Sequence, residues 1–400
     1  MIYIIIIVAL IILSYQYDYL KRTKHKKQWY YIILLVFILI AGLRYRIGVD
    51  SIRYESGFKF YPSLDELTAY DFVSSSHQPL YLLLSATARY ISDEFWVMQL
   101  FHSILVNVVV FRFLRFNTKN IFISILFYFI FLYNSFLFEA MRESCAVCML
   151  LLGWEFLKRN NWTVFTLFIF IATLFHVSAL PLLILPILKL LKLWNYLRVD
   201  KFSIIYLFGV FIVGNVIQSV FFDYIIQLNL IESVTDKAYR YVDTDYAGSN
   251  LNIFGLIESC VRQIIFPFLG CLILKQQKCN DRNVESMLLI CFTFILLSFS
   301  ISLAYRYNNY FYLFAIIVMS DAFFSKKVFI ANKVYMPLKS FHSWLTIVLV
   351  ITIIQLRGSF FTPLGDTGYK DYMRYHPYAN IITKQIDKNR ESLFFYYHAE

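Results

Sequence analysis

The first 27 residues, MIYIIIIVALIILSYQYDYLKRTKHKK, indicate both the class of fold and its orientation. An apolar run from Met1 to Leu20 is followed at once by five basic residues between Lys21 and Lys27. A helix that crosses a bilayer needs about 20 apolar residues, and the cytoplasmic ends of such helices collect Lys and Arg. Because the charge follows the run and no small-residue cleavage site is visible, we expect a retained span with its N-terminus outside, not a cleaved signal peptide.

The composition of the whole chain agrees with this start. Of 400 residues, 59% are hydrophobic and only 16% are charged, whereas about a quarter are charged in an ordinary soluble domain. This balance excludes a soluble globular enzyme, a disordered chain and a disulfide-rich scaffold. In a soluble protein, the net charge of +11 would suggest binding to nucleic acid. In a membrane protein, the first explanation is that cytoplasmic loops collect Lys and Arg and so set the orientation. We therefore expect no nucleic-acid partner.

Further apolar runs follow the first one along the chain. They predict an all-α, polytopic integral membrane protein with about 12 transmembrane helices, in a range of 10 to 13. We expect one transmembrane domain over residues 1–356. Its spans are predicted at 2–20, 29–43, 95–110, 121–138, 144–157, 162–179, 180–191, 202–222, 253–274, 287–303, 310–324 and 341–356.

The loops between these spans can be tested against the rule that basic residues stay inside. The loops placed inside carry 21 Lys and Arg, whereas the outside segments before the tail carry nine. This bias predicts that both termini lie outside. Three outside segments are long: 44–94, 223–252 and the tail 357–400. Within the first, Pro79–Ile91 is too short to span and is predicted to be an interfacial or re-entrant helix.

Charged and polar groups at the outer ends of the predicted spans are the candidates for function. A charge near the hydrocarbon is costly unless it is paired or hydrated, so such groups are functional candidates by default. Several arginines near one membrane face would form an anion site, since guanidinium binds phosphate oxygens in a bidentate way. These groups are Arg44, Arg46, Asp50, Tyr54, Glu139, Arg142, Glu143, His176, Arg262, Tyr305 and Arg306.

Four of these groups also have a structural interpretation. Arg44 and Arg46 would snorkel to lipid headgroups, Arg262 would pair with Glu258 four residues before it, and His176 would make an interhelical hydrogen bond. Metal-ligand spacings, phosphate-binding loops and nucleophile elbows are absent from the sequence. We therefore predict no metal and no cofactor.

Four segments in a fixed order resemble a known family. They are LRYRIGVDSIRY (43–54), FEAMRESCAV (138–147), FHVSALPLLILP (175–186) and AYRYNNYFYLF (304–314). Together they resemble the EpsG-type polysaccharide polymerases, which are grouped with the Wzy-like O-antigen and capsule polymerases of bacteria. The resemblance covers roughly residues 28–325. Family members often carry an acidic residue before the Pro-Leu-Tyr segment, where this chain has His77 and Gln78.

The resemblance implies a multi-pass glycosyltransferase of the bacterial inner membrane that works at the periplasmic face. Its substrates would be oligosaccharide repeat units on undecaprenyl pyrophosphate, for O-antigen, capsule or exopolysaccharide. Membrane lipids, a flippase and a chain-length regulator are the other expected partners. Without a metal motif, arginines are the available candidates to stabilise the leaving pyrophosphate, so the enzyme is expected to be metal-independent.

The individual roles can then be assigned as predictions. The arginines Arg44, Arg46, Arg142, Arg262 and Arg306, with Tyr54 and Tyr305, are predicted to bind the diphosphate and sugars. The acceptor hydroxyl needs a base within hydrogen-bond reach. The sequence leaves four candidates for that base, which are Asp50, Glu139, Glu143 and His176, and it assigns Gly48 to a tight turn.

Other functional classes remain open at this point. A flippase or transporter for the same lipid-linked sugar would need charges at the bilayer midplane and broken helices, and only Arg262 and the Pro-containing run at 180–191 fit that pattern. An O-antigen ligase would use a different acceptor. An acyltransferase would need an acyl donor, and its loss would leave polymer length unchanged.

Overall fold

The chain is described by a computed structural model that covers residues 2–75, 77–228, 253–301, 304–324, 328–330, 333–335, 350, 371–384, 390 and 392. It forms two compact units, one of Met1–Ile187 with Ser340–Glu400 and one of Leu188–Lys339. The predicted span 341–356, apart from Val350, lies outside the described residues, as do most of the loop 223–252 and much of the tail 357–400. The single transmembrane domain over 1–356 stays a prediction.

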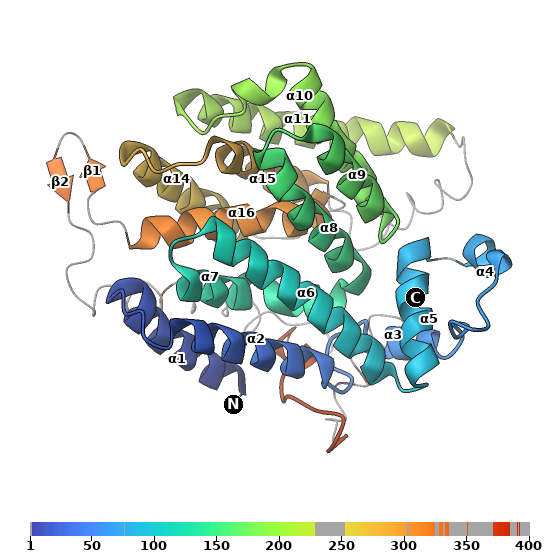
Figure 1. The fold of residues 1–400 in the computed structure, drawn as a ribbon. Helices are drawn as coiled ribbons and strands as arrows, with labels where there is room; N and C mark the ends of the chain where they lie inside the picture. The colour runs from blue at the N-terminus through green and yellow to red at the C-terminus, as the bar shows by residue number, and fades with distance from the viewer. Residues whose placement is uncertain are drawn as a thin grey trace. The chain divides into compact units, whose positions relative to one another are not determined.

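The first unit is built from helices joined by short turns (Figure 1). Its elements are α1 (Ile2–Leu13) with a π-helical turn (Ser14–Tyr19), α2 (Lys26–Gly42), α3 (Ser51–Phe58), α4 (Ala69–Ser74), α5 (Pro79–Ile91), α6 (Phe95–Asn117), α7 (Ile121–Tyr128) with π-helical turns at Phe129–Tyr133 and Ser135–Glu139, α8 (Met141–Lys158), α9 (Trp162–Thr173), a 3-10 helix (Val177–Leu183), α10 (Ile184–Leu190, which continues into the second unit) and a 3-10 turn (Asp371–Arg374).

The long helix α6 is central to this unit and packs against α2, α5 and α8. Two of its buried polar side chains hydrogen-bond to neighbouring helices, which offsets part of the cost of burying them in an apolar interior. His102 Nε2 lies 2.8 Å from Ser144 Oγ of α8, and the Ser103 hydroxyl donates to the Ile38 carbonyl of α2. These bonds set the register of α2, α6 and α8, and α2 and α8 lead to the candidate site.

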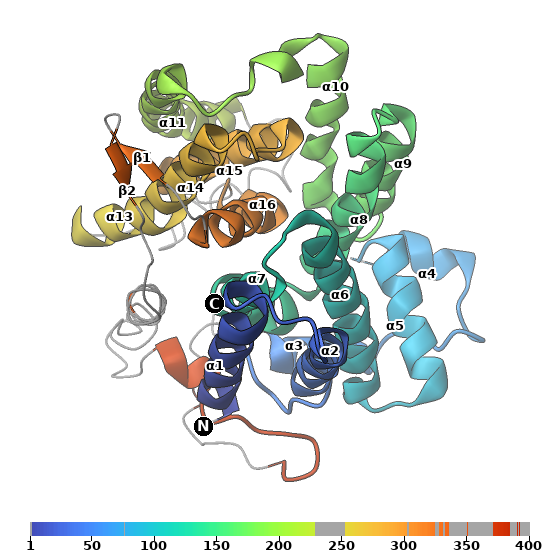
Figure 2. The same cartoon turned by 60° about the vertical axis from the view of Figure 1, so that its left-hand side comes forward.

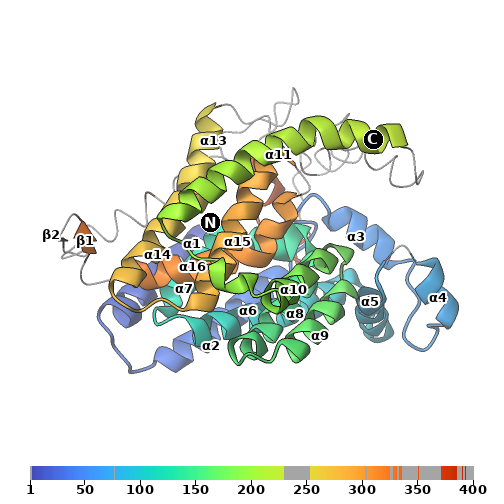
Figure 3. The ribbon, with the colours of Figure 1, turned by 90° about the horizontal axis from the view of Figure 1, so that it is seen from above.

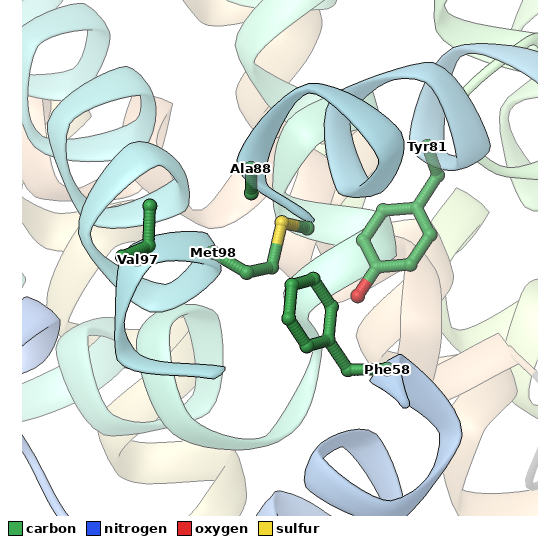
Figure 4. Packing of buried hydrophobic residues seen from close by; sticks show 5 residues of the cluster. All are labelled: Phe58, Tyr81, Ala88, Val97 and Met98. Atoms are coloured by element: carbon green, nitrogen blue, oxygen red, sulfur yellow. The ribbon is translucent and has the colours of Figure 1, made fainter. Parts of the chain in front are cut away.

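A separate hydrophobic cluster connects α3, α5 and α6 (Figure 4). Phe58, Tyr81, Ala88, Val97 and Met98 are each at most 5% exposed. The bounds of α5 agree with the interfacial or re-entrant helix predicted over 79–91, since proline favours the first position of a helix. The cluster holds α3 and α5 against α6.

The second unit contains a 3-10 turn (Leu193–Tyr196), α11 (Lys201–Leu228), α13 (Ile253–Cys260), a π-helical turn (Val261–Ile265), α14 (Phe266–Gln276), α15 (Arg282–Ser300), α16 (Tyr305–Phe323) and an antiparallel pair of strands, β1 (Val328–Ile330) and β2 (Lys333–Tyr335). Helix α15 packs along α16 and α11, and α14 packs on α16 (Figure 3). The strands, which are drawn in Figure 2, were not predicted because this segment reads as a short basic loop.

The apolar helices suggest a multi-pass membrane protein. Within the described residues, three helices are long and apolar enough to cross a membrane, namely Ile2–Tyr19, Phe95–Asn117 and Arg282–Ser300. Shorter apolar helices lie at Ile121–Tyr133, Trp162–Thr173, Val177–Leu190 and Lys201–Ile217. The described residues are therefore mainly helical, with the short hairpin as their one pair of strands. The number of spans and the outside location of both termini stay predictions.

One stretch is divided differently from the predicted spans 162–179 and 180–191. Helix α9 ends at Thr173, and a 3-10 helix with Pro181 inside it leads into α10. Proline lacks the N–H that an α-helix needs, so the chain cannot run straight through this position. His176 precedes the 3-10 helix as its N-cap residue, and the spans 162–179 and 180–191 stay predictions.

Candidate functional site

The site forms around the segment that joins α2 to α3. This segment makes an isolated bridge with the C-terminal segment Asp371–Lys384, in which Arg44 pairs with Asn380. The amide of Tyr45 donates to the Ala379 carbonyl at 3.0 Å. In Figure 2 the red C-terminal segment lies beside α1, and the Tyr3 hydroxyl of α1 donates to the Tyr375 carbonyl. Segments that are far apart in sequence are thus hydrogen-bonded to each other at this place.

Gly48 makes the turn within this segment. Its φ is +95°, and a Cβ at this position would lie 2.7 Å from the Phe138 carbonyl oxygen. Only glycine adopts such a conformation without strain and allows so close an approach. The Gly48 amide donates to the Arg374 carbonyl at 3.1 Å. The turn therefore brings the residues after Gly48 against the end of the helical segment that contains Phe138.

Glu139 accepts hydrogen bonds from the backbone that follows this turn. Its carboxylate accepts the amides of Val49 at 3.1 Å and Asp50 at 3.3 Å. The Tyr375 hydroxyl donates to the same carboxylate at 2.9 Å. In the described part of the chain, no Lys, Arg or His lies within ion-pairing distance of it. The carboxylate is thus held by neutral donors.

The protonation of Glu139 follows from this environment. Burial raises the pKa of the carboxyl above its usual range, the charge of Arg374 lowers it in part, and the charge of Asp50 raises it further. A carboxylate that is desolvated and has no close cation is easier to protonate. The Glu139 carboxyl is therefore easier to protonate than an exposed glutamate, because its pKa is raised.

Arg142 lies three residues further along the chain, in the first turn of α8. Its Nη1 donates to Nδ1 of His77 at 2.8 Å, while its Nε is buried and has no hydrogen-bond partner. No carboxylate of the described residues lies within ion-pairing distance of Arg142. The guanidinium thus keeps an uncompensated positive charge.

The imidazole that accepts from Arg142 and the two tyrosines near it are neutral. Because a guanidinium only donates, Nδ1 of His77 must be the unprotonated acceptor. Burial and the Arg142 charge lower the pKa of His77 to about 4, so the ring is neutral at neutral pH. Burial raises the pKa of Tyr54 to about 12, with Arg142 partly opposing it, and raises the pKa of Tyr61 to about 12 in the same way.

Tyr54 connects the two charged groups. Its hydroxyl donates to the Glu139 carbonyl at 3.3 Å, and its side chain is close enough to Arg142 and Asp50 to respond to both charges. An uncompensated cation and a carboxylate without a cation therefore lie within one small cluster. We call this set the outer cluster, and define it as Asp50, Tyr54, His77, Glu139 and Arg142.

The other two arginines of the first unit differ from Arg142. Arg46 Nε lies 2.7 Å from Glu55 Oε2, so its charge is compensated. Arg44 has no exposed surface. It donates to the Ala41 carbonyl and lies over the Phe138 ring. Of the three, Arg142 is the arginine best placed to receive an anion.

The remaining predicted residues lie elsewhere. Glu143 and His176 are 6% and 8% exposed in the first unit, and His176 Nδ1 accepts the Ser178 amide. Arg262 lies in the π-helical turn of the second unit, and Tyr305 and Arg306 begin α16. The side chain of Glu258, the predicted partner of Arg262, lies outside the described residues. These assignments stay predictions.

Sequence reasoning missed two residues of this site, and a metal site is not evident. His77 was noted only as a departure from a family pattern, and Tyr375 lies in a tail with no motif. Its role depends on a contact across 236 residues, which no local pattern signals. Among the described residues, no three His, Cys, Asp or Glu side chains are grouped so that they could hold a metal ion.

Comparison with known proteins supplies the family. No curated protein and no solved structure matches this chain. A family model described as the EpsG family matches residues 27–364, which confirms the resemblance expected over roughly 28–325. Since the match covers most of the chain, the protein belongs to the EpsG family.

Proposed function

We propose that this protein is a polysaccharide polymerase of the bacterial inner membrane. Membership of the EpsG family suggests a role in exopolysaccharide synthesis, and the apolar helices suggest a multi-pass membrane protein. In the proposed reaction, the growing chain is transferred from undecaprenyl pyrophosphate to a new lipid-linked repeat unit at the periplasmic face. A flippase would deliver these units, and a chain-length regulator would act on the product.

The observation that carries this proposal is the uncompensated charge of Arg142. Arg46 of the same unit forms an ion pair with Glu55. Arg142 instead contacts the neutral His77 and keeps a buried Nε without a partner. A pyrophosphate group would supply the missing acceptors, since guanidinium binds phosphate oxygens strongly. Arg142 would then stabilise the charge that develops on the leaving group.

Glu139 is the proton acceptor in this proposal. Its raised pKa and its lack of a close cation suit a base better than a purely structural anion. Two backbone amides and the Tyr375 hydroxyl hold its orientation. Asp50 supports the basicity through its negative charge.

The bonds balance in a single displacement. The acceptor hydroxyl oxygen forms a bond to the anomeric carbon of the donor sugar, and its proton passes to Glu139. The bond from the anomeric carbon to the phosphate oxygen breaks, and its electron pair leaves with the lipid pyrophosphate. Arg142 neutralises that leaving group, and no oxidant or reductant is required.

The proposal is tested with the purified protein in liposomes that contain lipid-linked repeat units. We expect a ladder of polymers in which free undecaprenyl pyrophosphate is released once per added unit. Glu139→Gln should lower the rate at least about 100-fold, since a positioned base contributes about 100- to 10,000-fold. Arg112→Gln is the matched control because Arg112 is an exposed residue of α6 outside the outer cluster. Repeat units that stay unpolymerised under all conditions would overturn the proposal.

A second candidate, a transporter of the lipid-linked sugar, is favoured by interrupted helices at two places. The helical segment Val177–Leu190 changes from 3-10 to α-helix around Pro181, and the helix at Arg262 contains a π-helical turn. Broken helices are common where transporters bind substrate. Movement of a labelled lipid-linked unit across the same liposomes, without polymer formation, would support the transporter.

A further inference from the structure

The imidazole of His77 has one nitrogen that makes no bond within the outer cluster. Nδ1 accepts from Arg142 Nη1 at 2.8 Å, and the ring is neutral at neutral pH. A neutral imidazole carries its proton on the nitrogen that does not accept, so Nε2 is a donor. No described group hydrogen-bonds this N–H. Unlike the buried Nε of Arg142, Nε2 also retains accessible surface, so a ligand can reach it.

The neighbours of His77 hold this donor in place and strengthen it. The rings of Tyr61 and Tyr81 pack against the imidazole in edge-to-face geometry, with centroids at 5.4 Å and 5.9 Å. The hydrogen bond from Arg142 polarises the imidazole, because hydrogen bonds in a chain strengthen one another. The outer cluster therefore presents one oriented N–H donor with a positive charge behind it.

Arg53 brings a second positive charge to the same ring. It is an exposed residue of α3, and no carboxylate of the described residues lies within ion-pairing distance of it. Burial, the charge of Arg142 and the charge of Arg53 all lower the pKa of His77, and no described carboxylate opposes them. The Tyr61 hydroxyl likewise has no described partner and retains accessible surface. The groups near the imidazole are thus cations and free donors.

These groups specify the chemistry of a ligand. A phosphate oxygen accepts hydrogen bonds and carries negative charge, so it suits an N–H donor, a hydroxyl and a guanidinium together. A diphosphate has two charged groups and can engage two arginines at once, whereas a single phosphate has one. A neutral sugar would gain nothing from the two positive charges.

We propose that His77 contacts the diphosphate of the lipid carrier through its Nε2–H, with Arg53 as a second cation beside Arg142. This inference rests on the proposed function and adds two residues to its site. Arg142 then acts partly through His77, because it fixes the tautomer that leaves the proton on Nε2. A protonated imidazole would have no acceptor for Arg142, so the neutral ring is the form that binds.

The test measures binding of inorganic pyrophosphate, farnesyl pyrophosphate and inorganic phosphate to the purified protein. We expect both pyrophosphates to bind more tightly than phosphate. His77→Leu should weaken pyrophosphate binding about tenfold, as for loss of a hydrogen bond to a charged group. Arg53→Gln should weaken it about threefold, since salt screens an exposed charge. Phosphate binding as tight as that of the pyrophosphates would assign the site to free phosphate and overturn the proposal.

Three further variants make this test specific. His77→Gln should retain most of the binding, because an amide both accepts and donates. His25→Leu and Arg112→Gln are the matched controls, since both residues are exposed and lie outside the outer cluster. Binding that falls equally in the controls would overturn the assignment to His77 and Arg53.

A second measurement observes the imidazole itself and does not depend on the folding of His77→Leu. In protein with 15N-labelled histidine, the His77 signal is identified by its loss in His77→Gln. At neutral pH we expect protonated Nε2 and unprotonated Nδ1, with a shift of the Nε2–H signal when pyrophosphate is added. An Nε2–H signal that does not respond to saturating pyrophosphate would overturn the contact.

The outcomes separate this inference from the proposed function. Equal pyrophosphate binding by His77→Leu and wild type would overturn the contact even if polymer forms. Binding that depends on His77, in a protein that forms no polymer, would support the contact and reject the polymerase. If both hold, His77→Leu should lower kcat/KM for polymer formation about tenfold, while His77→Gln stays near wild type.

Discussion

Glu285 of the second unit and Glu139 of the first unit are both carboxylates within a helical bundle, but their surroundings differ. Glu285 is 3% exposed and forms an ion pair with Lys275. It also accepts the Val199 amide at 2.6 Å and the Asn280 side chain at 2.9 Å. Glu139 is held by amides and a tyrosine hydroxyl, with no cation of the described residues at ion-pairing distance.

The two environments indicate how a structural charge differs from one that is proposed to act on substrate. A buried carboxylate that only stabilises a fold needs a cation and full hydrogen bonding, because desolvation is costly. Glu285 meets both conditions. In the outer cluster, Glu139 and Arg142 each lack an opposite charge at ion-pairing distance. A bound substrate would supply the missing partner groups. Four experiments test this contrast.

The largest effect is expected for Arg142→Gln, which removes the uncompensated cation. We expect the rate of polymer formation to fall about 100- to 1,000-fold, as for the loss of one transition-state donor. Thermal unfolding should change little, since Arg142 makes no ion pair in the described structure. Arg142→Lys keeps the charge without the bidentate fork and should recover only part of the rate. Unchanged ladders in Arg142→Gln would reject its role.

Lys275→Met is the opposite case, since it leaves Glu285 buried without its cation. We expect a loss of about 3 kcal/mol in the free energy of unfolding, the low end for a broken buried pair because Lys275 is partly exposed. The measurement is chemical denaturation in detergent, with activity scored per folded molecule. If Lys275→Met kept normal stability but lost much of its activity, Glu285 would be a functional carboxylate and not a structural one.

Tyr375→Phe tests a positioning role in the outer cluster. Loss of one hydrogen bond to Glu139 costs about 1 kcal/mol, so we expect kcat to fall about fivefold with KM unchanged. The hydroxyl favours the ionised carboxylate, so its removal should move the acid limb of the pH–rate profile to higher pH. Tyr378→Phe is the matched control, because that hydroxyl donates to the Ile40 carbonyl instead. Identical pH profiles in both variants would exclude the role.

The smallest effect concerns pH and His77. Its pKa in the folded protein is about 4, below the ordinary value of about 6.5. A lowered pKa means that the stability from neutral His77 is present above pH 6.5 and is lost as pH falls toward 4. We expect less than about 1 kcal/mol, because the ring is partly exposed. His77→Gln should reduce this loss in a thermal unfolding series, and an equal loss in both proteins would exclude the effect.

Much of the fold could be predicted from sequence because apolar runs determine where helices form. The helix α5 agrees with the prediction for 79–91, since proline begins it and its apolar run is short. The region around Pro181 was not predicted in detail, because sequence patterns do not show whether a proline kinks a helix or divides it. The β1–β2 hairpin carries no turn signal strong enough to distinguish it from a basic loop.

The candidate site was predictable only in part. Charges at the ends of apolar runs mark Glu139 and Arg142, but composition cannot show which arginine finds a counter-ion. That distinction depends on the ion pair between Glu55 and Arg46 and on the hydrogen bond between Arg142 and His77. Both contacts depend on how α3 and α5 pack. The contribution of Tyr375 depends on a contact between distant segments, which no local pattern contains.

The pairing of residues 43–48 with the C-terminal segment has a consequence for synthesis. Helices can insert one after another as the chain leaves the ribosome, and the N-terminal parts of a chain fold first. Glu139 receives its tyrosine only after almost the whole chain has emerged. A partly made protein can therefore occupy the membrane while its site is incomplete, so unfinished chains are not expected to consume lipid-linked sugar.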